Sequence, residues 1–182
     1  MNKWRILKSA VITDRRPWIR VCEHEVLLPN GTHLDSYITW EEREYALVVA
    51  TTRQGIPLVR QYKHGVQSYS LDLPGGYLNE NETPLIAAQR ELMEETGLAA
   101  GVWKHLGSLV LDNNRGRARA HLYFAREARV VTTPTPDTTE DLSIQYYPRD
   151  QVGVMIRDGS ISSLPSVTAI LMAWEWIENC QV

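Results

Sequence analysis

One long predicted helix inside a chain of strand-like runs constrains the fold more than any other feature. Thr83-Pro84 marks its start, because proline is tolerated at the first helical position, and Gly97 marks its end. The runs around it are typical of strands: YALVVAT and IPLVRQY, joined by the hairpin signal TRQG, then RAHLYFA and LSIQYY. Helix-like segments at residues 150–159 and 165–177 close the chain. This order predicts an α/β or α+β layered sheet.

The C-terminal half of this helix carries three glutamates where helix energetics disfavours them. Glu91, Glu94 and Glu95 stand at i, i+3 and i+4, so their carboxylates share one face. Like charges at this spacing repel by roughly 0.2–0.5 kcal/mol per pair. Anions near a helix C-terminus also oppose the helix dipole, at a cost of about 0.3–1 kcal/mol each. An arrangement that local energetics disfavours twice indicates a compensating partner.

Two interpretations of this acidic face fit the sequence, a solvated surface or a cation site. Apolar residues gather on the opposite side, where we expect the core to lie: Leu85, Ile86, Ala88, Leu92 and Met93. The preceding segment DLPGG contains two glycines, which allow the backbone to approach a ligand closely. Carboxylates and carbonyl oxygens suit Mg²⁺ or Mn²⁺ rather than Zn²⁺. A bound divalent cation offsets the repulsion, so we interpret the glutamates as metal ligands.

Composition argues against several other classes of protein. A chain of 182 residues suits one domain that buries a core without disulfides or structural metals. Its formal net charge of −3 gives no electrostatic basis for binding nucleic acid or an anionic membrane. The start MNKWRILKSAV lacks the apolar core of a signal peptide, and no run reaches the roughly 18 apolar residues of a membrane span. Cys22 and Cys180 form no CxxC pair, which predicts reduced thiols in a cytoplasmic protein.

Residues 76–98 match a known motif. The sequence GYLNENETPLIAAQRELMEETGL fits the Nudix box, G-x5-E-x7-R-E-(apolar)-x-E-E-x-G-(apolar), at every defined position. Those positions are Gly76, Glu82, Arg90, Glu91, Leu92, Glu94, Glu95, Gly97 and Leu98. The chain therefore resembles the Nudix hydrolases. The resemblance implies the Nudix fold, a mixed β-sheet sandwiched between α-helices, with the box forming a loop, a helix and a second loop.

The resemblance also implies a metal site within and beside the box. Glu91 and Glu95 correspond to the main Mg²⁺ ligands of the family, with Mn²⁺ as a possible substitute. Glu94 corresponds to a residue that shares a further ion. The backbone carbonyl of Gly75 is a further expected ligand.

Two residues of the box are candidate catalytic residues by the same resemblance. Arg90 is expected to orient the carboxylates and to pair with Glu82, an ordinary surface ion pair being the alternative. Glu94 is the second candidate. The family hydrolyses nucleoside diphosphates linked to another moiety, and Mg²⁺ neutralises the charge and activates water for that reaction. A remaining carboxylate then acts as the general base.

Outside the box, the chain resembles the ADP-ribose and nucleotide-sugar diphosphatases. VLLPNGT resembles their N-terminal hairpin, and LVRQYKHGVQSYSLDLPGG resembles the segment that leads into the box. TTEDLSIQYY and the helical segments after it resemble their closing part. In that subgroup a glutamate from the late loop assists catalysis or metal binding. Glu140 in TTED matches this catalytic residue, and Asp141 is the alternative.

The same resemblance suggests residues that contact the substrate. Lys63 stands where the subgroup has a phosphate-contacting arginine, and lysine supplies the charge without a planar fork. Proteins of the subgroup are typically homodimers whose N-terminal strands exchange and whose aromatics sandwich the base. Trp4 and Tyr37 match those aromatics, a place in the core being the alternative. We therefore expect residues 1–44 to take part in dimerisation and residues 45–182 to form the Nudix domain, in one folding unit overall.

One segment after the box departs from the subgroup. Many ADP-ribose diphosphatases have a proline about fifteen residues beyond the box, whereas this chain reads LDNNRGRARAHLYFAR there. Arg115, Arg117 and Arg119 alternate, so a strand would place them on one face. Such a face could bind phosphate, which makes Arg115 a candidate substrate contact, or it could be a solvated basic edge.

The expected function is Mg²⁺-dependent hydrolysis of ADP-ribose or a related nucleoside diphosphate sugar, giving a nucleoside monophosphate and a sugar phosphate. Two alternatives stay open on the sequence alone. One is a Nudix pyrophosphatase of another small molecule, such as an NADH-like dinucleotide or a nucleoside triphosphate. The other is a module that binds a nucleotide without cleaving it, which the complete set of box glutamates disfavours.

Overall fold

The structure is a computed structural model that describes residues 2–138 and 141–179. It divides into two compact units. The first unit contains residues 1–44 and 110–119, and the second contains residues 45–109 and 120–182. Each unit has its own β-sheet structure, and the Nudix box lies wholly within the second.

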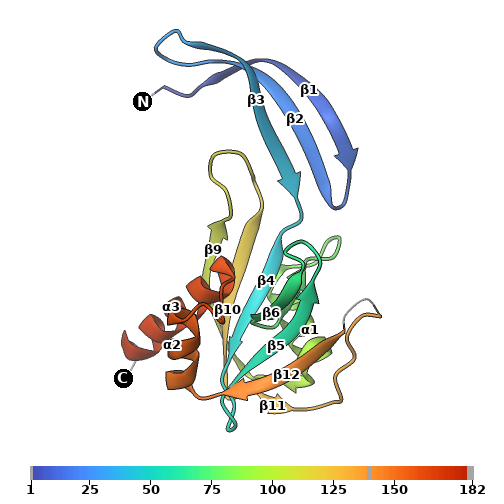
Figure 1. The fold of residues 1–182 in the computed structure, drawn as a ribbon, viewed down its shortest axis with the longest axis vertical. Coiled ribbons are helices and arrows are strands. Elements are labelled where there is room, and N and C mark those ends of the chain that lie inside the picture. The colour runs from blue at the N-terminus through green and yellow to red at the C-terminus, as the bar shows by residue number, and fades with distance from the viewer. Residues whose placement is uncertain (1, 139–140, 180–182) are drawn as a thin grey trace. The chain divides into compact units, whose positions relative to one another are not determined.

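The first unit is built on an antiparallel sheet in the order β1-β2-β3 (Figure 1). Its strands are β1 (Arg5–Arg15), β2 (Ile19–Leu27) and β3 (His33–Glu42). Between β2 and β3, the Leu28 N–H donates to the Thr32 carbonyl at 2.9 Å, and Gly31 has a φ of 86°. A positive φ favours glycine. The hairpin predicted around PNG is therefore confirmed.

Residues 110–119 add a loop to the first unit. The Trp40 N–H donates to the Arg115 carbonyl at 3.0 Å, and the Gly116 N–H closes a turn onto the Asp112 carbonyl at 3.0 Å. Arg115 lies in that turn, Arg117 follows it, and Arg119 begins strand β10 (Arg119–Arg126). The three arginines therefore do not share one strand, and the single basic face that a strand would give them does not form, because a turn occupies the backbone at Arg115.

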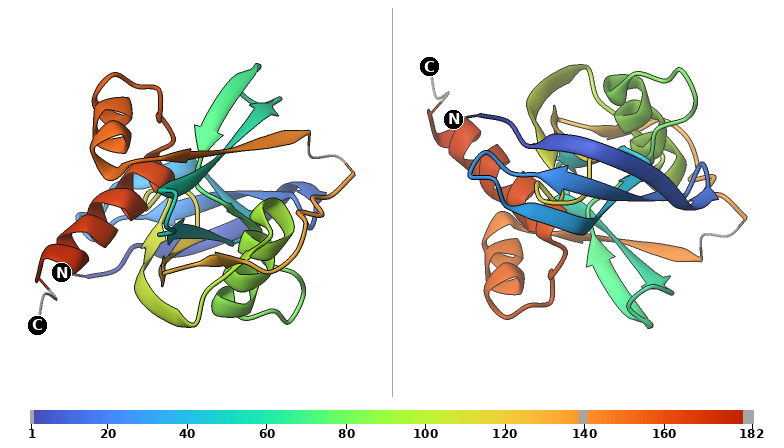
Figure 2. Two further views of the ribbon diagram at one scale, coloured as in Figure 1. Left: turned by 90° about the horizontal axis from the view of Figure 1, so that it is seen from below. Right: turned by 90° about the horizontal axis from the view of Figure 1, so that it is seen from above.

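The second unit contains a mixed sheet in the order β7-β4-β10-β9. Strand β4 (Tyr45–Ala50) runs parallel to β10 and antiparallel to β7 (Gly75–Tyr77), and β9 (Val102–Val110) forms the edge. Helix α1 (Pro84–Thr96) lies on one side of the sheet (Figures 1 and 2). Helices α2 (Arg149–Arg157) and α3 (Leu164–Asn179) lie on the other. The predicted fold class is confirmed.

Strand β4 is buried on both faces. Every residue from Ala46 to Ala50 is at most 7% exposed. Successive side chains of a strand point to opposite faces, and one set packs with α1 in a core cluster that includes Ala46, Val48 and Leu92. The other set faces α3, which also packs on this strand. Burial on both faces explains why this strand reads as a continuous apolar run.

A second, antiparallel sheet lies beside the first in the order β12-β5-β6. Its strands are β5 (Ile56–Lys63), β6 (Ser68–Asp72) and β12 (Leu142–Tyr147), and a short pair joins β8 (Leu98–Ala99) to β11 (Arg129–Val130). The predicted hairpin between β4 and β5 is wrong. TRQG does form a turn, with the Thr52 N–H donating to the Gly55 carbonyl at 3.1 Å. Because β4 has β7 and β10 as its neighbours, the turn carries the chain into the other sheet.

The buried face of α1 differs from the predicted one. Leu85, Ile86 and Met93 are 37%, 54% and 43% exposed. The buried residues are instead Ala87, Ala88, Glu91, Leu92, Glu95 and Thr96. Two alanines let the helix approach the sheet closely, and this rotates the contact face toward the glutamates. The acidic face of α1 is therefore only partly exposed to solvent.

The described helices include none with both the length and the apolar character needed to cross a bilayer.

Two neighbouring residues of α1 test this placement. Leu92→Ala should lower the free energy of unfolding by about 2–5 kcal/mol, because Leu92 is fully buried and its truncation leaves a cavity. Met93→Ala should cost less than about 1 kcal/mol, since its side chain is half-exposed. Urea denaturation of both variants measures the difference. Equal losses would show that the helix is rotated from the position described.

Candidate active site

Local signals at both ends fix the position of α1. The Thr83 hydroxyl accepts a hydrogen bond from the Ile86 N–H at 3.4 Å, and Pro84 occupies the first turn. At the other end, Gly97 has a φ of 70° and its N–H donates to the Met93 carbonyl at 2.8 Å. A side chain there would also meet the Thr132 carbonyl oxygen, 2.2 Å from the Cβ position. The predicted start and end of the helix are confirmed.

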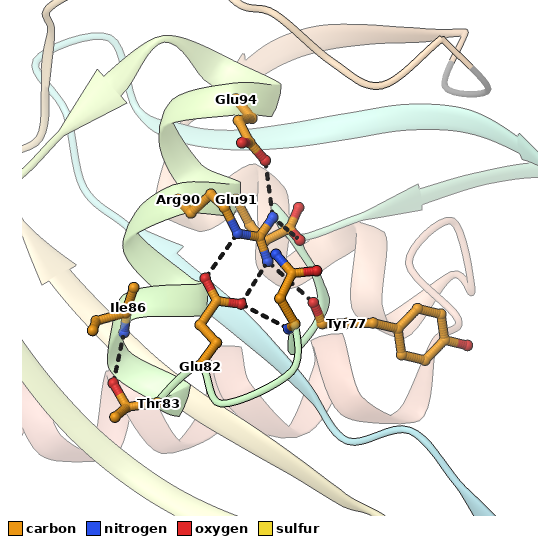
Figure 3. A network of polar contacts seen from close by, with 8 residues as sticks. Tyr77, Glu82, Thr83, Ile86, Arg90, Glu91 and Glu94 are labelled. Atoms are coloured by element: carbon orange, nitrogen blue, oxygen red, sulfur yellow. Dashed lines mark hydrogen bonds and ion pairs between the residues drawn. The ribbon is translucent and has the colours of Figure 1, made fainter. Parts of the chain in front are cut away.

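Arg90 connects the acidic residues of the box (Figure 3). Its Nε and Nη2 donate to the two carboxylate oxygens of Glu82 at 2.9 and 3.0 Å. Its Nη1 donates to Glu91 at 2.6 Å and to Glu94 at 2.9 Å. Nη2 also reaches the Tyr77 carbonyl at 3.1 Å. The predicted pair between Arg90 and Glu82 is present, and its two-pronged geometry is one that lysine could not reproduce.

This network is largely removed from solvent. The Glu82 and Glu91 side chains are each 9% exposed, and that of Arg90 is 23% exposed. The hydrogen bond to Glu82 is the main cause that raises the pKa of Arg90 above its ordinary value, with Glu91 and Glu94 adding to it against the effect of burial. Arg90 therefore keeps its charge at neutral pH.

Two glycines form the wall against which the glutamates lie. The Gly75 N–H donates to Glu95 Oε2 at 2.8 Å. A Cβ at Gly75 would lie 2.2 Å from the Ala46 carbonyl oxygen, and one at Gly76 would lie 2.4 Å from Glu91 Oε1. Contacts that short do not occur between unbonded atoms, so Gly75, which meets backbone, requires glycine, whereas a side chain at Gly76 would displace the Glu91 carboxylate. The Gly75–Gly76 part of strand β7 thus brings backbone against two carboxylates.

The charge and chemistry of this cluster suit a hard divalent cation. Arg90 supplies one positive charge against four box carboxylates, and Glu91 and Glu95 are 7% and 3% exposed. In the described part of the chain, no three His, Cys, Asp or Glu side chains converge in a geometry that would hold an ion. Mg²⁺ is usually bound by one or two carboxylates, with water and substrate phosphates completing its shell. Two buried glutamates beside the extended Gly75–Gly76 backbone of β7 fit that requirement.

A buried serine in α3 supports the segment that leads into β7, and no pattern in the sequence indicated it. Ser166 in α3 is fully buried. Its hydroxyl donates to Asp72 Oδ1 at 3.1 Å and accepts from the Leu73 N–H at 3.3 Å. Asp72 and Leu73 immediately precede Pro74 and Gly75. The C-terminal helix therefore holds the segment that places the Gly75 N–H against Glu95.

Comparison with known proteins identifies the family. The family model for the NUDIX domain matches residues 41–167, more than half of the chain. The chain belongs to the NUDIX domain family. The predicted family is confirmed, and so is the predicted class of enzyme, a Nudix hydrolase.

Known relatives share most of the length of this Nudix chain. It is 27% identical over 168 residues to a CMP-5′-(N-acetyl-N-hydroxy-3-aminopropyl)phosphonate hydrolase of Streptomyces rubellomurinus, covering 92% of this chain and 80% of that protein. It is 28% identical over 149 residues to an ADP-ribose pyrophosphatase of Mycobacterium tuberculosis, covering 81% and 72%. A crystal structure of an ADP compounds hydrolase superposes with a TM-score of 0.88 at 22% identity, covering 100% of this chain and 97% of the other. That structure supports the fold.

Three of the four predicted substrate contacts lie together in the first unit of this Nudix protein. The rings of Trp4 and Tyr37 meet edge to face with centroids 5.6 Å apart. The Arg115 guanidinium lies 4.9 Å from the centroid of Tyr37 and donates to the Ile38 carbonyl at 3.0 Å. Trp4 is 49% exposed, so the cluster is not a core. Its role in binding stays a prediction.

The remaining candidates stand apart from that cluster. Lys63 lies at the end of β5 in the second unit, where its amino group donates to Gln61 of the same strand. Glu140 lies outside the described residues. Asp141, the alternative, is exposed just before β12. The catalytic and substrate-binding roles of these residues, and the metal-binding roles of the box residues, stay predictions.

Replacing Arg90 tests whether it holds the buried carboxylates. Arg90→Met keeps the length of the side chain but leaves Glu82 and Glu91 without this partner, so the free energy of unfolding should fall by about 3–5 kcal/mol. Glu94→Gln is the control, because a half-exposed carboxylate contributes less than about 1 kcal/mol. Denaturation of both variants in EDTA buffer measures the effect without metal. A loss for Arg90→Met no larger than that of the control would contradict this role.

Proposed function

We propose that the protein is a Mg²⁺-dependent hydrolase of ADP-ribose or a related nucleoside diphosphate sugar, releasing a nucleoside monophosphate and a sugar phosphate. The observation that carries the proposal is the pair of buried glutamates, Glu91 and Glu95, held beside the glycines of β7 by Arg90 and by a backbone N–H. Mn²⁺ is expected to substitute for Mg²⁺, because both are bound by oxygen ligands.

Relatives support the substrate class. The names of the proteins compared above refer to hydrolysis of compounds of ADP-ribose, of ADP and of CMP. A nucleotide joined through phosphorus to a second group is common to them. We place ADP-ribose first among substrates because the chain outside the box also resembles that subgroup. The relative named for a CMP compound carries a different base from the two named for ADP compounds.

Different residues of the chain would hold the metal and accept the proton in the proposed reaction. Bound Mg²⁺ supplies positive charge to the diphosphate oxygens and activates water. Glu91 and Glu95 would hold it, since each is fixed by a hydrogen bond from Arg90 or Gly75 and so needs little rearrangement. Glu94 is 39% exposed and lies on the same helix face, where it could take the proton from water. Glu140, the other candidate base, lies outside the described residues.

The aromatic cluster of the first unit is the proposed site for the base of the substrate. Trp4 and Tyr37 offer ring faces and edges, and Arg115 adds positive charge over Tyr37. Aromatic rings stack on nucleobases with little dependence on the base. Lys63 is proposed to contact phosphate with its single charge.

A homodimer formed through residues 1–44 is also proposed, with residues 45–182 as the Nudix domain. Strand β1 exposes apolar side chains in the single chain: Ile6 at 56%, Val11 at 50% and Ile12 at 56%. It also lies at an edge of its sheet. An edge strand with exposed apolar residues favours pairing with another chain. We also propose a small-molecule substrate, no nucleic-acid or membrane partner, and a cytoplasmic location. Cys22 is a buried free thiol.

The proposed activity is tested by assaying hydrolysis with and without metal. EDTA should abolish turnover and Mg²⁺ or Mn²⁺ should restore it, because the buried carboxylates cannot neutralise a diphosphate. Comparison of kcat/KM should rank ADP-ribose and nucleotide sugars above dinucleotides and nucleoside triphosphates. Full activity in EDTA would refute the metal dependence. A triphosphate or dinucleotide preferred by more than about tenfold, or about 1.4 kcal/mol, would refute the substrate class but not the family.

Glu95→Gln separates catalysis from folding. The glutamine oxygen can still accept the Gly75 N–H, whereas the ligand charge is lost, so turnover should fall on the order of 10²-fold or more. Metal-free thermal stability should equal or exceed that of the wild type, because repulsion within α1 decreases. Glu80→Gln, an exposed position of the loop before α1, is the control and should retain wild-type turnover. Near-normal rates for Glu95→Gln at low Mg²⁺ would remove Glu95 from the metal site.

A further inference from the structure

A cavity of about 670 Å³ lies in the second unit, and none of the acidic residues at the defined positions of the box lines it. Two segments form its walls, residues 51–54 after β4 and residues 127–130 after β10, which include β11. Leu98 and Tyr146 complete it. Strands β4 and β10 run parallel, so the cavity lies beyond their carboxyl ends, where open α/β sheets commonly bind ligands. Its volume is within the range of small-molecule sites, about 300–1,000 Å³.

Hydrogen bonds join the two segments that form the walls. The Ala128 N–H donates to the Thr51 carbonyl at 2.7 Å, and the Glu127 N–H donates to the Thr51 hydroxyl at 3.1 Å. The Thr51 N–H in turn donates to the Ala125 carbonyl at 2.9 Å. These bonds hold the backbone at Thr51, Glu127 and Ala128 in place. The cavity is therefore preformed, and a ligand would be recognised by side chains.

The side chains at the rim favour an anion. Arg53 lines the cavity from the segment after β4, and Arg129 lines it from the segment after β10. Within residues 2–138 and 141–179, neither guanidinium makes an ion pair or side-chain hydrogen bond, unlike Arg90, which has four partners. The acid at the rim, Glu127, pairs with Arg126 at 3.4 Å. Two guanidinium groups with unused donors suit the oxygens of a phosphate.

The floor of the cavity is apolar. Leu98 is 2% exposed and Ala128 is 4% exposed, and both belong to the core cluster of α1 and the mixed sheet. The partly buried ring of Tyr146 packs against the same cluster. An aromatic ring and two aliphatic side chains offer contact area to a flat, weakly polar group rather than to a bare inorganic ion.

We propose that this cavity is a second ligand site, which binds a small organic phosphate bearing a planar ring, of the size of a nucleoside monophosphate. Its phosphate lies between Arg53 and Arg129, and its ring lies on Leu98 and Tyr146. Binding there requires neither a divalent metal nor the box glutamates, so this proposal does not rest on the proposed activity.

Titration of the full chain with AMP in EDTA buffer, followed by ¹H–¹⁵N NMR, tests the site. AMP should shift the backbone amides of residues 51–54 and 127–130 and leave Gly75 and Gly76 unchanged. The double variant Arg53→Gln/Arg129→Gln should bind AMP at least tenfold more weakly. Arg157→Gln, an exposed arginine outside the cavity, is the matched control and should bind as the wild type does. An unchanged melting temperature confirms that each variant is folded.

Three other ligands separate the contributions of the base, the sugar and the phosphate to binding. One variant tests whether the box glutamates take part. Adenosine and inorganic phosphate should each bind at least tenfold more weakly than AMP, and ribose 5-phosphate should fall between. Glu95→Gln should leave AMP binding in EDTA unchanged. Shifts confined to Gly75 and Gly76, wild-type affinity of the double arginine variant, or phosphate binding as tight as that of AMP would each overturn the proposal.

Discussion

The hydrogen bonds from Arg90 to three carboxylates are the interaction on which the acidic part of the structure depends. Glu82 and Glu91 are almost fully buried, and a buried charge that lacks a partner is strongly destabilising. The planar guanidinium reaches the loop before α1 through Glu82 and the helix itself through Glu91 and Glu94. One side chain therefore fixes both the approach to the helix and the orientation of its acids.

The glycines are the second half of the same arrangement. Gly76 allows the Glu91 carboxylate to lie against the backbone, and Gly75 donates its N–H to Glu95. The repulsion calculated from helix spacing is thus offset in two ways without metal, by a guanidinium and by a backbone dipole. What remains is an excess of negative charge on the face of α1 that carries Glu91, Glu94 and Glu95.

Local signals predicted much of this site from sequence. Thr83-Pro84 and Gly97 act on their own neighbours, so the helix ends were correct. The pair between Arg90 and Glu82 followed from the motif. The buried face of α1 was predicted wrongly, because two alanines let the helix approach the sheet on a side that hydrophobicity does not mark. The contacts of Ser166 and the change of sheet after β4 depend on residues distant in sequence. Hydrophobic periodicity reports only local structure, so it could not predict them.

The bond between Ser166 and Asp72 joins residues 94 positions apart, and it has a consequence for synthesis on the ribosome. The helix that carries the glutamates emerges from the ribosome well before α3 does. Until Ser166 is available, the segment before Gly75 lacks its hydroxyl partner and β4 lacks the cover of α3 on one face. A nascent chain that stops short of α3 would therefore carry every residue of the Nudix box and still lack the support that sets their geometry.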